Sequence, residues 1–244
     1  MGRCGRFGML VCAGAAAALL ASPRATVRAQ EPPPDGGELY LQYCASCHGA
    51  GAGGTANGPS LLGVGPAAVD FQLRTGRMPL SDPARQAQRK PSPFEPQQIE
   101  ALVDYVASLS PGGPAIPSIA PEQGDLAAGS ELFINECAPC HGATGNGGAV
   151  GADALAPPVG NASPLEVAEA TLTGPGQMPR FAFSPEELDA IVAFTEHLRT
   201  TPAHGGADIG GIGSVPEGFV AWFGGALTLV VIAYVVGKSW GREG

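Results

Sequence analysis

Two copies of the pattern Cys-x-x-Cys-His-Gly carry the chemistry of this sequence. Two thiols one helical turn apart can add to the two vinyl groups of a haem, and the adjacent imidazole then ligates the iron. The spacing therefore predicts covalently attached c-type haem, and two copies predict two covalently bound haem c groups. The predicted attaching and ligating residues are Cys44, Cys47 and His48 in the first copy and Cys137, Cys140 and His141 in the second.

Two other interpretations of the pattern are a Cys-x-x-Cys redox pair and half of a zinc site. A zinc site needs further Cys or His at ligand spacing, and the chain has no other Cys beyond residue 12. A redox pair does not require a histidine directly after it, in either copy. The haem interpretation is therefore favoured.

Met78 and Met178 are the second chemical signature, because each stands in a Thr-Gly phrase and is followed by proline. A thioether is a soft, neutral ligand, and His/Met ligation raises the potential of a haem. Proline also restricts the residue before it to an extended backbone, which suits a loop that brings sulfur to iron. Filling a gap in the core is the alternative role for a methionine. The repeated context favours axial ligation of the two irons.

The elements that must position these residues recur in the same order. A helix running into each motif would place Leu39 and Tyr40, or Leu132 and Phe133, on one packing face. An amphipathic helix closes each copy, and in the second copy it opens with an N-cap, Ser184, and a Glu three residues on. Helix, haem motif, Gly-rich loop, Met-Pro and helix is the order of a class I cytochrome c domain. The apolar faces of the closing helices are Ile99, Leu102, Val103, Val106 and Leu109, and Leu188, Ile191, Val192, Thr195 and Leu198.

The two copies differ in the spacing around their methionines. His and Met are 30 residues apart in the first copy and 37 in the second, and the first copy carries an 11-residue insertion after Met78. That region is basic, so it is either a docking face near the first haem or a solvated loop, and Arg77 is a candidate partner for a haem propionate. We expect His197 and His204 to face solvent. The basic residues are Arg74, Arg77, Arg85, Arg89 and Lys90.

The N-terminal segment has the features of a secretory signal. Arg3 and Arg6 precede an apolar run, and Val27 and Ala29 suit a cleavage site. An uncleaved membrane anchor is the alternative. Cys12 is a poor candidate for lipid attachment, because Val11 before it is not a small residue.

Residues 218–237 are twenty residues without a charge, long enough as a helix to cross a bilayer. Trp222 and Trp240 suit the two interfaces, and Lys238 and Arg242 provide the positive flank expected on the cytoplasmic side. We therefore expect a single-pass protein of the cytoplasmic membrane, with its haem domains on the extracytoplasmic side and its C-terminus in the cytoplasm.

These features predict a mainly α fold with two tandem class I cytochrome c domains and one C-terminal transmembrane helix. With 37 Gly, 24 Pro and 6% aromatics the protein core is thin, and two haems would supply apolar bulk. A formal charge of −9 argues against nucleic acid as a partner. The expected division is signal peptide or N-terminal anchor 1–29, first domain 30–113, Pro-rich linker 114–124, second domain 125–205, Gly-rich linker 206–217, transmembrane helix 218–237 and cytoplasmic tail 238–244.

Two six-coordinate haems leave no open iron site, so outer-sphere electron transfer is the favoured activity and no residue is expected to be catalytic. One alternative is a dihaem subunit that accepts electrons from a periplasmic dehydrogenase. Others are a dihaem peroxidase, which needs a vacant haem, and a haem-based sensor or assembly factor.

The whole order, the phrases at 63–71 and 75–80, and the Pro-Glu-Gly before the last helix resemble the dihaem cytochrome cc subunit of bcc-type menaquinol–cytochrome c reductases. The resemblance implies partners: the cytochrome b and Rieske iron–sulfur subunits, and the copper-site subunit of a haem–copper oxidase. It implies transfer of electrons from the Rieske protein through both haems to that oxidase, within a supercomplex. The chain alone would be an electron carrier, the cytochrome c subunit of a quinol–cytochrome c oxidoreductase.

Overall fold

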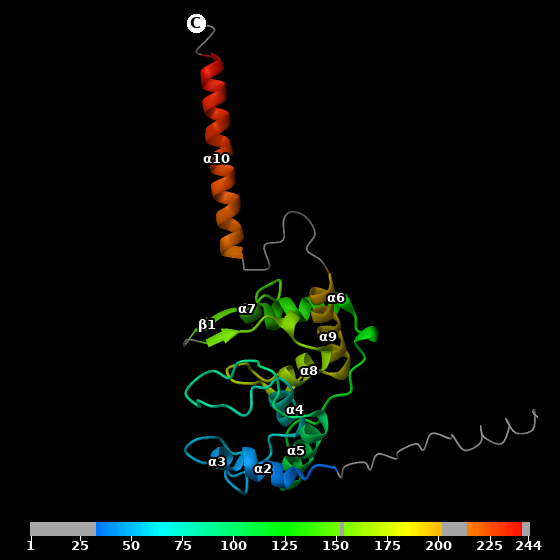
Figure 1. The fold of residues 1–244 in the computed structure, drawn as a ribbon. Helices are drawn as coiled ribbons and strands as arrows, with labels where there is room; N and C mark the ends of the chain where they lie inside the picture. The colour runs from blue at the N-terminus through cyan, green and yellow to red at the C-terminus, as the bar shows by residue number, and fades with distance from the viewer. Residues whose placement is uncertain (1–32, 152–153, 202–213, 241–244) are drawn as a thin grey trace, which may run out of the picture. The chain divides into compact units, whose positions relative to one another are not determined.

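The structure, a computed structural model, describes residues 33–151, 154–201 and 214–240 (Figure 1). Residues Pro34–Gly244 belong to one compact unit. The expected signal segment 1–29 with Cys12, the position of His204 and the cytoplasmic Arg242 lie outside the described residues.

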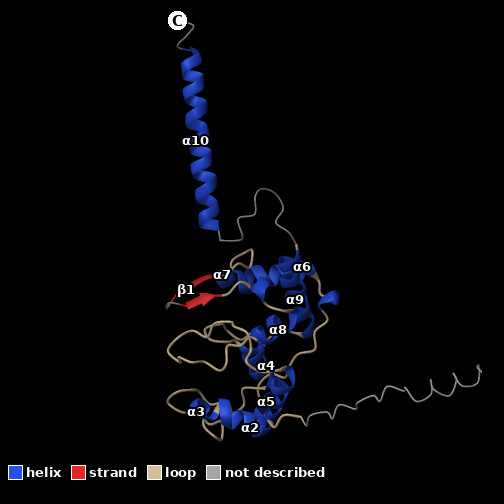
Figure 2. Ribbon diagram, in the orientation of Figure 1, coloured by secondary structure: helices blue, strands red, loops and turns tan. Residues whose placement is uncertain are grey.

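Helices dominate the described chain, and they follow one another in two repeats and a C-terminal segment (Figure 2). The first repeat contains α2 (Gly36–Tyr43), α3 (Ala45–His48), α4 (Pro66–Arg74) and α5 (Pro96–Leu109). The second contains η2 (Pro121–Gln123), α6 (Leu126–Leu132), the π-helical turn η3 (Phe133–Cys137), α7 (Ala138–His141), β1 (Gly148–Gly151), β2 (Ala154–Ala156), η4 (Val159–Asn161), α8 (Pro164–Thr173) and α9 (Pro185–Thr200). The C-terminal segment is α10 (Ser214–Trp240).

An aspartate caps the first helix of each repeat. Asp35 Oδ1 accepts hydrogen bonds from the backbone N–H groups of Gly37 and Glu38, at 2.8 and 3.0 Å. Asp125 caps α6 in the same way. A short polar side chain at this place satisfies N–H groups that have no partner inside the helix. Both copies therefore start the helix that leads into the haem motif at a fixed residue.

Glycine allows the first and last helices of each repeat to cross closely. A Cβ atom at Gly36 would overlap the carbonyl of Ala101 on α5, and one at Gly129 would overlap the carbonyl of Ala190 on α9. Because glycine has no Cβ, the two backbones come into contact at both crossings. The two repeats thus share one packing constraint.

Each repeat has its own hydrophobic core, built on the helix faces expected from the sequence. Tyr40 and Phe133, from the helical segments that lead into the motifs, are both 0% exposed. The predicted faces of α5 and α9 are buried except for their last members, Leu109 and Leu198, which are partly buried. This confirms the amphipathic helices, and the Ser184–Glu187 capping box is present. The buried core residues are Tyr40, Ala52, Leu73, Phe94, Ile99, Leu102, Val103 and Val106 in the first repeat, and Phe133, Cys137, Ala168, Leu188, Ile191 and Val192 in the second.

A two-stranded hairpin explains most of the length difference between the copies. β1 and β2 pair antiparallel in the loop after the second haem motif. His48 is 11 residues from the proline whose carbonyl contacts it, whereas His141 is 16 residues from the corresponding proline. The second copy has seven more residues between its histidine and its methionine than the first copy, and five of them lie in this loop, where the hairpin forms.

The Pro-rich segment between the repeats is bound at both ends. The backbone N–H of Ala67 donates to the carbonyl of Pro114 (3.2 Å), and that of Ala120 donates to Asp189 Oδ1 (2.7 Å). Helices α4 and α8 also contact each other. The sequence predicts a Pro-rich linker here, and in the structure this segment packs on both repeats.

Residues Gly218–Lys238 of α10 are long and apolar enough to cross a membrane, with a mean hydropathy of 2.2. Large apolar side chains along it are exposed, for example Trp222 at 70% and Leu229 at 68%. The expected C-terminal helix is thus present as a single continuous element, and by length and composition it is a candidate membrane span.

We predict that Gly129→Ala destabilises the second repeat. The added methyl would overlap the Ala190 carbonyl and approach Phe194 Cβ. Overpacking of this kind typically lowers the free energy of unfolding by about 1–3 kcal/mol, and the thermal midpoint in detergent by roughly 2–12 °C. Gly51→Ala is the control, because a Cβ there meets nothing within 4 Å. Equal midpoints for the two variants would show that the helix crossing does not require glycine.

Candidate haem sites

His48 is the last residue of α3, and its imidazole is held in one orientation. The ring is 8% exposed, and its Nδ1 lies 2.8 Å from the carbonyl oxygen of Pro59. A carbonyl can only accept, so Nδ1 carries the proton and donates. The lone pair of Nε2 is then available to a metal, which is the usual arrangement of a ligating histidine.

His141 repeats this arrangement at the end of α7. Its Nδ1 lies 2.8 Å from the carbonyl oxygen of Pro157. The loops between histidine and proline differ in length and in secondary structure, yet the donor, the acceptor and the distance are the same. Two imidazoles with the same tautomer and a free Nε2 fit two iron sites.

The first cysteine of each motif lacks the lowered pKa of a redox-active cysteine. Burial first, and then the neighbouring Cys47, raise the pKa of the Cys44 thiol to about 11. Burial also raises the pKa of Cys137 to about 11, followed by Glu136 and Cys140. Reactive redox cysteines have a lowered pKa, since the thiolate is the nucleophile. Among residues 33–151, 154–201 and 214–240, no three Cys, His, Asp or Glu side chains converge on a metal site.

The loop after the first motif is fixed by hydrogen bonds to the motif itself. The hydroxyl of Tyr40 donates to the carbonyl of Gly49 (2.8 Å), and Thr55 Oγ1 donates to the carbonyl of Cys47 (2.6 Å). Gly49 has φ 78°, a backbone conformation that favours glycine. These contacts hold the chain that supplies Pro59 next to His48.

Each methionine lies in the segment directly after a helix. Met78 is partly buried and packs against the first core, which Cys44 also contacts, and its N–H donates to the carbonyl of Gln72 (3.1 Å). Met178 is partly buried beyond α8, and its N–H donates to the carbonyl of Pro175 (3.2 Å). The structure therefore brings Met78 and Cys44 onto one core.

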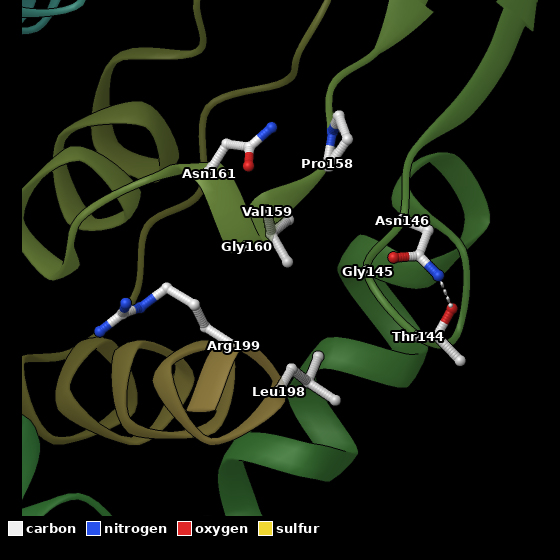
Figure 3. Close-up of a pocket in the computed structure, with 9 residues that line it drawn as sticks. All are labelled: Thr144, Gly145, Asn146, Pro158, Val159, Gly160, Asn161, Leu198 and Arg199. Atoms are coloured by element: carbon white, nitrogen blue, oxygen red, sulfur yellow. Dashed lines mark hydrogen bonds between the residues drawn. The ribbon is translucent and has the colours of Figure 1, made fainter. Parts of the chain in front are cut away.

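A cavity of about 370 Å³ lies in the second repeat (Figure 3). Its lining is polar and loop-rich, and the Asn146 side chain donates to Thr144 Oγ1 (3.0 Å). No attaching or ligating residue lines it. The lining residues are Thr144, Gly145, Asn146, Pro158, Val159, Gly160, Asn161, Leu198 and Arg199.

The basic insertion of the first repeat binds the second repeat. Both terminal nitrogens of Arg89 donate to the carboxylate of Glu166 on α8, at 2.8 to 3.0 Å. The side-chain amide of Gln86 exchanges two hydrogen bonds with the backbone of Leu155, at 2.8 and 3.0 Å. Part of the insertion thus contacts the second repeat. Neither of the two roles expected from the sequence, a docking face or a solvated loop, included this internal contact. His197 is exposed, as expected.

Comparison with known proteins gives the family. Residues 31–106 and 124–194 match the family described as cytochrome c oxidase, cbb3-type, subunit III. The cytochrome bc1 complex cytochrome c subunit of Corynebacterium diphtheriae is 38% identical over 84% of this chain and 80% of its own length. That of Mycobacterium leprae is 36% identical over 94% of this chain and 84% of its own length. The chain belongs to the family of cytochrome bc1 complex cytochrome c subunits.

A third relative is more distant. The cbb3-type cytochrome c oxidase subunit CcoP of Rhodobacter capsulatus is 33% identical over 46% of this chain and 39% of its own length. The resemblance expected from the sequence is confirmed, and so is the mainly α fold with two cytochrome c domains, at 31–106 and 124–194. This cytochrome c subunit is therefore an electron-transfer protein with covalently bound haem c.

Sequence reasoning missed α4 and α8, together with the charged residues on them. The signal for α8 was present, because Ser163 and Glu166 form a capping box with Pro164 at the first helical position. The same pattern opens α9. Helix α4 begins with Pro66 and has no capping side chain, so only its proline marks the start.

We predict a measurable coupling between Arg89 and Glu166. A double-mutant cycle with Arg89→Ala and Glu166→Ala should give about 0.5–2 kcal/mol, toward the lower end because the Arg89 side chain is 41% exposed. The cycle cancels the loss of the Glu166 contact to the Ser163 N–H (2.7 Å). Urea unfolding of the haem-loaded protein provides the free energies.

Arg199 and Glu196 provide the matched control, since this ion pair is exposed and lies within one helix. We expect its coupling to be smaller than that of Arg89 and Glu166. Equal couplings would mean that the contact between the domains contributes no more than a surface ion pair.

Proposed function

We propose that this cytochrome c subunit carries two haems and transfers electrons from the Rieske protein of a quinol–cytochrome c reductase to a haem–copper oxidase. One observation carries the proposal. Two haem motifs in one compact unit each present an imidazole whose Nδ1 is fixed by a proline carbonyl at 2.8 Å. Two equivalent iron sites in one chain suit a relay better than a single-site carrier.

The ligand sets follow from the motifs. Cys44 and Cys47 would attach the first haem, with His48 and Met78 as its axial ligands. Cys137 and Cys140 would attach the second, with His141 and Met178. When bound, haem supplies one-electron redox chemistry. Pro59 and Pro157 orient the two imidazoles through their carbonyl groups, and Met78 and Met178 would supply thioether sulfur to the irons, which favours a higher potential.

Arg77 is a candidate partner for a propionate of the first haem. Its guanidinium lies 4.8 Å over the ring of Phe71, and its Nη1 is buried without a hydrogen-bond partner in the described structure. A buried guanidinium nitrogen requires an acceptor. A haem carboxylate would supply one, and the two-nitrogen fork of arginine suits carboxylate geometry.

The membrane helix supports a tethered carrier. In the proposed orientation α10 crosses the cytoplasmic membrane, with the haem domains on the extracytoplasmic side and Lys238 toward the cytoplasm. Tethering raises the effective concentration of the haem domains beside their partners. The named relatives belong to cytochrome bc1 complexes, which supports cytochrome b and the Rieske protein as partners. The partial match to an oxidase subunit supports the oxidase as acceptor.

Met178→Ala should lower the potential of one haem by about 0.1 V or more, within the roughly 0.8 V range that axial ligands span. The reduced variant should also bind carbon monoxide, because a ligand position opens, whereas the wild type should not. Met78→Ala should act on the other haem. Redox titration and carbon monoxide difference spectra measure both effects. An unchanged redox titration of Met178→Ala would show that Met178 does not ligate the iron. Carbon monoxide binding by the wild type would favour a peroxidase.

Purification in mild detergent through a C-terminal tag tests the place of the chain in respiration. We expect cytochrome b, the Rieske protein and oxidase subunits to copurify, with covalent haem on this chain in a haem-stained gel. Mass spectrometry identifies the copurifying chains. Recovery with a dehydrogenase would identify that enzyme, rather than the Rieske protein, as the electron donor. Recovery with neither reductase nor oxidase subunits would overturn the proposed relay.

A further inference from the structure

Charged side chains gather where α4 of the first cytochrome domain contacts α8 of the second. Two of them are carboxyl groups that are almost inaccessible to solvent: Asp70 is 1% exposed and Glu169 is 0% exposed. The charged residues at this contact are Asp70 and Arg74 on α4, Glu166 and Glu169 on α8, and Arg77 and Arg89 from the segment after α4.

Two ion pairs among the described residues join four of these six charges and leave out Arg77 and Glu169. Arg74 Nε donates to Asp70 Oδ2 at 2.6 Å, and Arg89 binds Glu166. Both carboxyl oxygens of Glu169 and the remaining oxygen of Asp70, Oδ1, are buried without a donor among the described residues. Two ionised carboxylates can only accept, so neither can satisfy the other. A fully buried carboxylate in this position takes up a proton rather than remaining charged.

We propose that Glu169 and Asp70 form a proton-binding site buried between the two cytochrome domains. Glu169 holds the proton and donates it to Asp70 Oδ1, while Arg74 occupies Oδ2. One proton gives these oxygens a donor, and it leaves a single negative charge beside the guanidinium of Arg74. The shared proton also links α8 to α4, and therefore one domain to the other.

The surroundings of Glu169 favour the protonated form. Burial first, then repulsion by Asp70 and the hydrogen bond to Asp70, and finally repulsion by Glu166, raise the pKa of Glu169 from 4.5 to about 9, although Arg74 opposes them. The unfolded chain, with the ordinary value, loses this proton near pH 4.5. The folded protein retains it up to about pH 9. The contribution of Glu169 to stability therefore falls as the pH rises between these two values and is constant outside them.

Infrared spectroscopy of the full haem-loaded chain in detergent tests the proton directly. At pH 7 the wild type should show the C=O stretch of a protonated carboxylic acid, and Glu169→Gln should lack it. Glu196→Gln, at an exposed glutamate paired with Arg199, should retain the band. If the band is absent from the wild type, or persists in Glu169→Gln, the proposal is wrong.

Urea unfolding between pH 5 and pH 9 tests how much the buried proton contributes to the stability of the folded protein. Glutamine resembles the protonated acid and can still donate to Asp70, so Glu169→Gln should be stable at pH 7 and should lack this titration. The unfolding equilibrium constant of the wild type, divided by that of Glu169→Gln, should rise about tenfold per pH unit in this window. A ratio independent of pH would overturn the proposal.

Asp70→Asn gives a second test that does not depend on the folding of Glu169→Gln. Removing the negative charge of Asp70 removes the principal repulsion on Glu169. The carboxylic acid band should then disappear at a lower pH than in the wild type. A band that disappears at the same pH in both proteins would show that Asp70 is not part of the site.

Discussion

Each cytochrome domain depends on the close crossing of its first and last helices. At Gly36 and at Gly129 the backbone of one helix touches a carbonyl of the other, at Ala101 and Ala190. This contact sets the position of the first helix against the last, and the helical chain that follows leads into the haem motif. The loop after the motif then brings a proline carbonyl to Nδ1 of the histidine. A change in the helix crossing would therefore displace the ligating histidine.

A second constraint comes from the small protein core. The buried clusters hold few large side chains, and the aromatic share is only 6%. Haem would supply part of the apolar interior, so folding and haem attachment depend on each other. The raised pKa of Cys44 and of Cys137 fits this dependence, because Cys44 is partly buried against the first core and Cys137 is buried in the second.

The local features could be predicted from the sequence, and the contacts between distant segments could not. The haem motifs, the Met-Pro phrases and the faces of α5 and α9 are short-range patterns, and family and fold followed from them. The pairing of Arg89 with Glu166 joins residues 77 positions apart, and nothing in the local sequence of either residue specifies the other. Asp70 and Glu169 are likewise ordinary surface residues until α4 and α8 meet. Their burial is a property of tertiary packing.

The duplication itself indicates how this contact arose. Thr75 and Thr173 close α4 and α8 with equivalent hydrogen bonds, from Oγ1 to the carbonyls of Phe71 and Glu169. Aligned on these threonines, Asp70 corresponds to Ala168, and Glu169 to Phe71. Each carboxyl group thus stands where the other copy has an apolar residue. Asp70 and Glu169 therefore meet at positions where the two copies differ, and the contact between α4 and α8 brings two acidic groups together. A proton on Glu169 would make the two carboxyl groups compatible, because one of them could then donate.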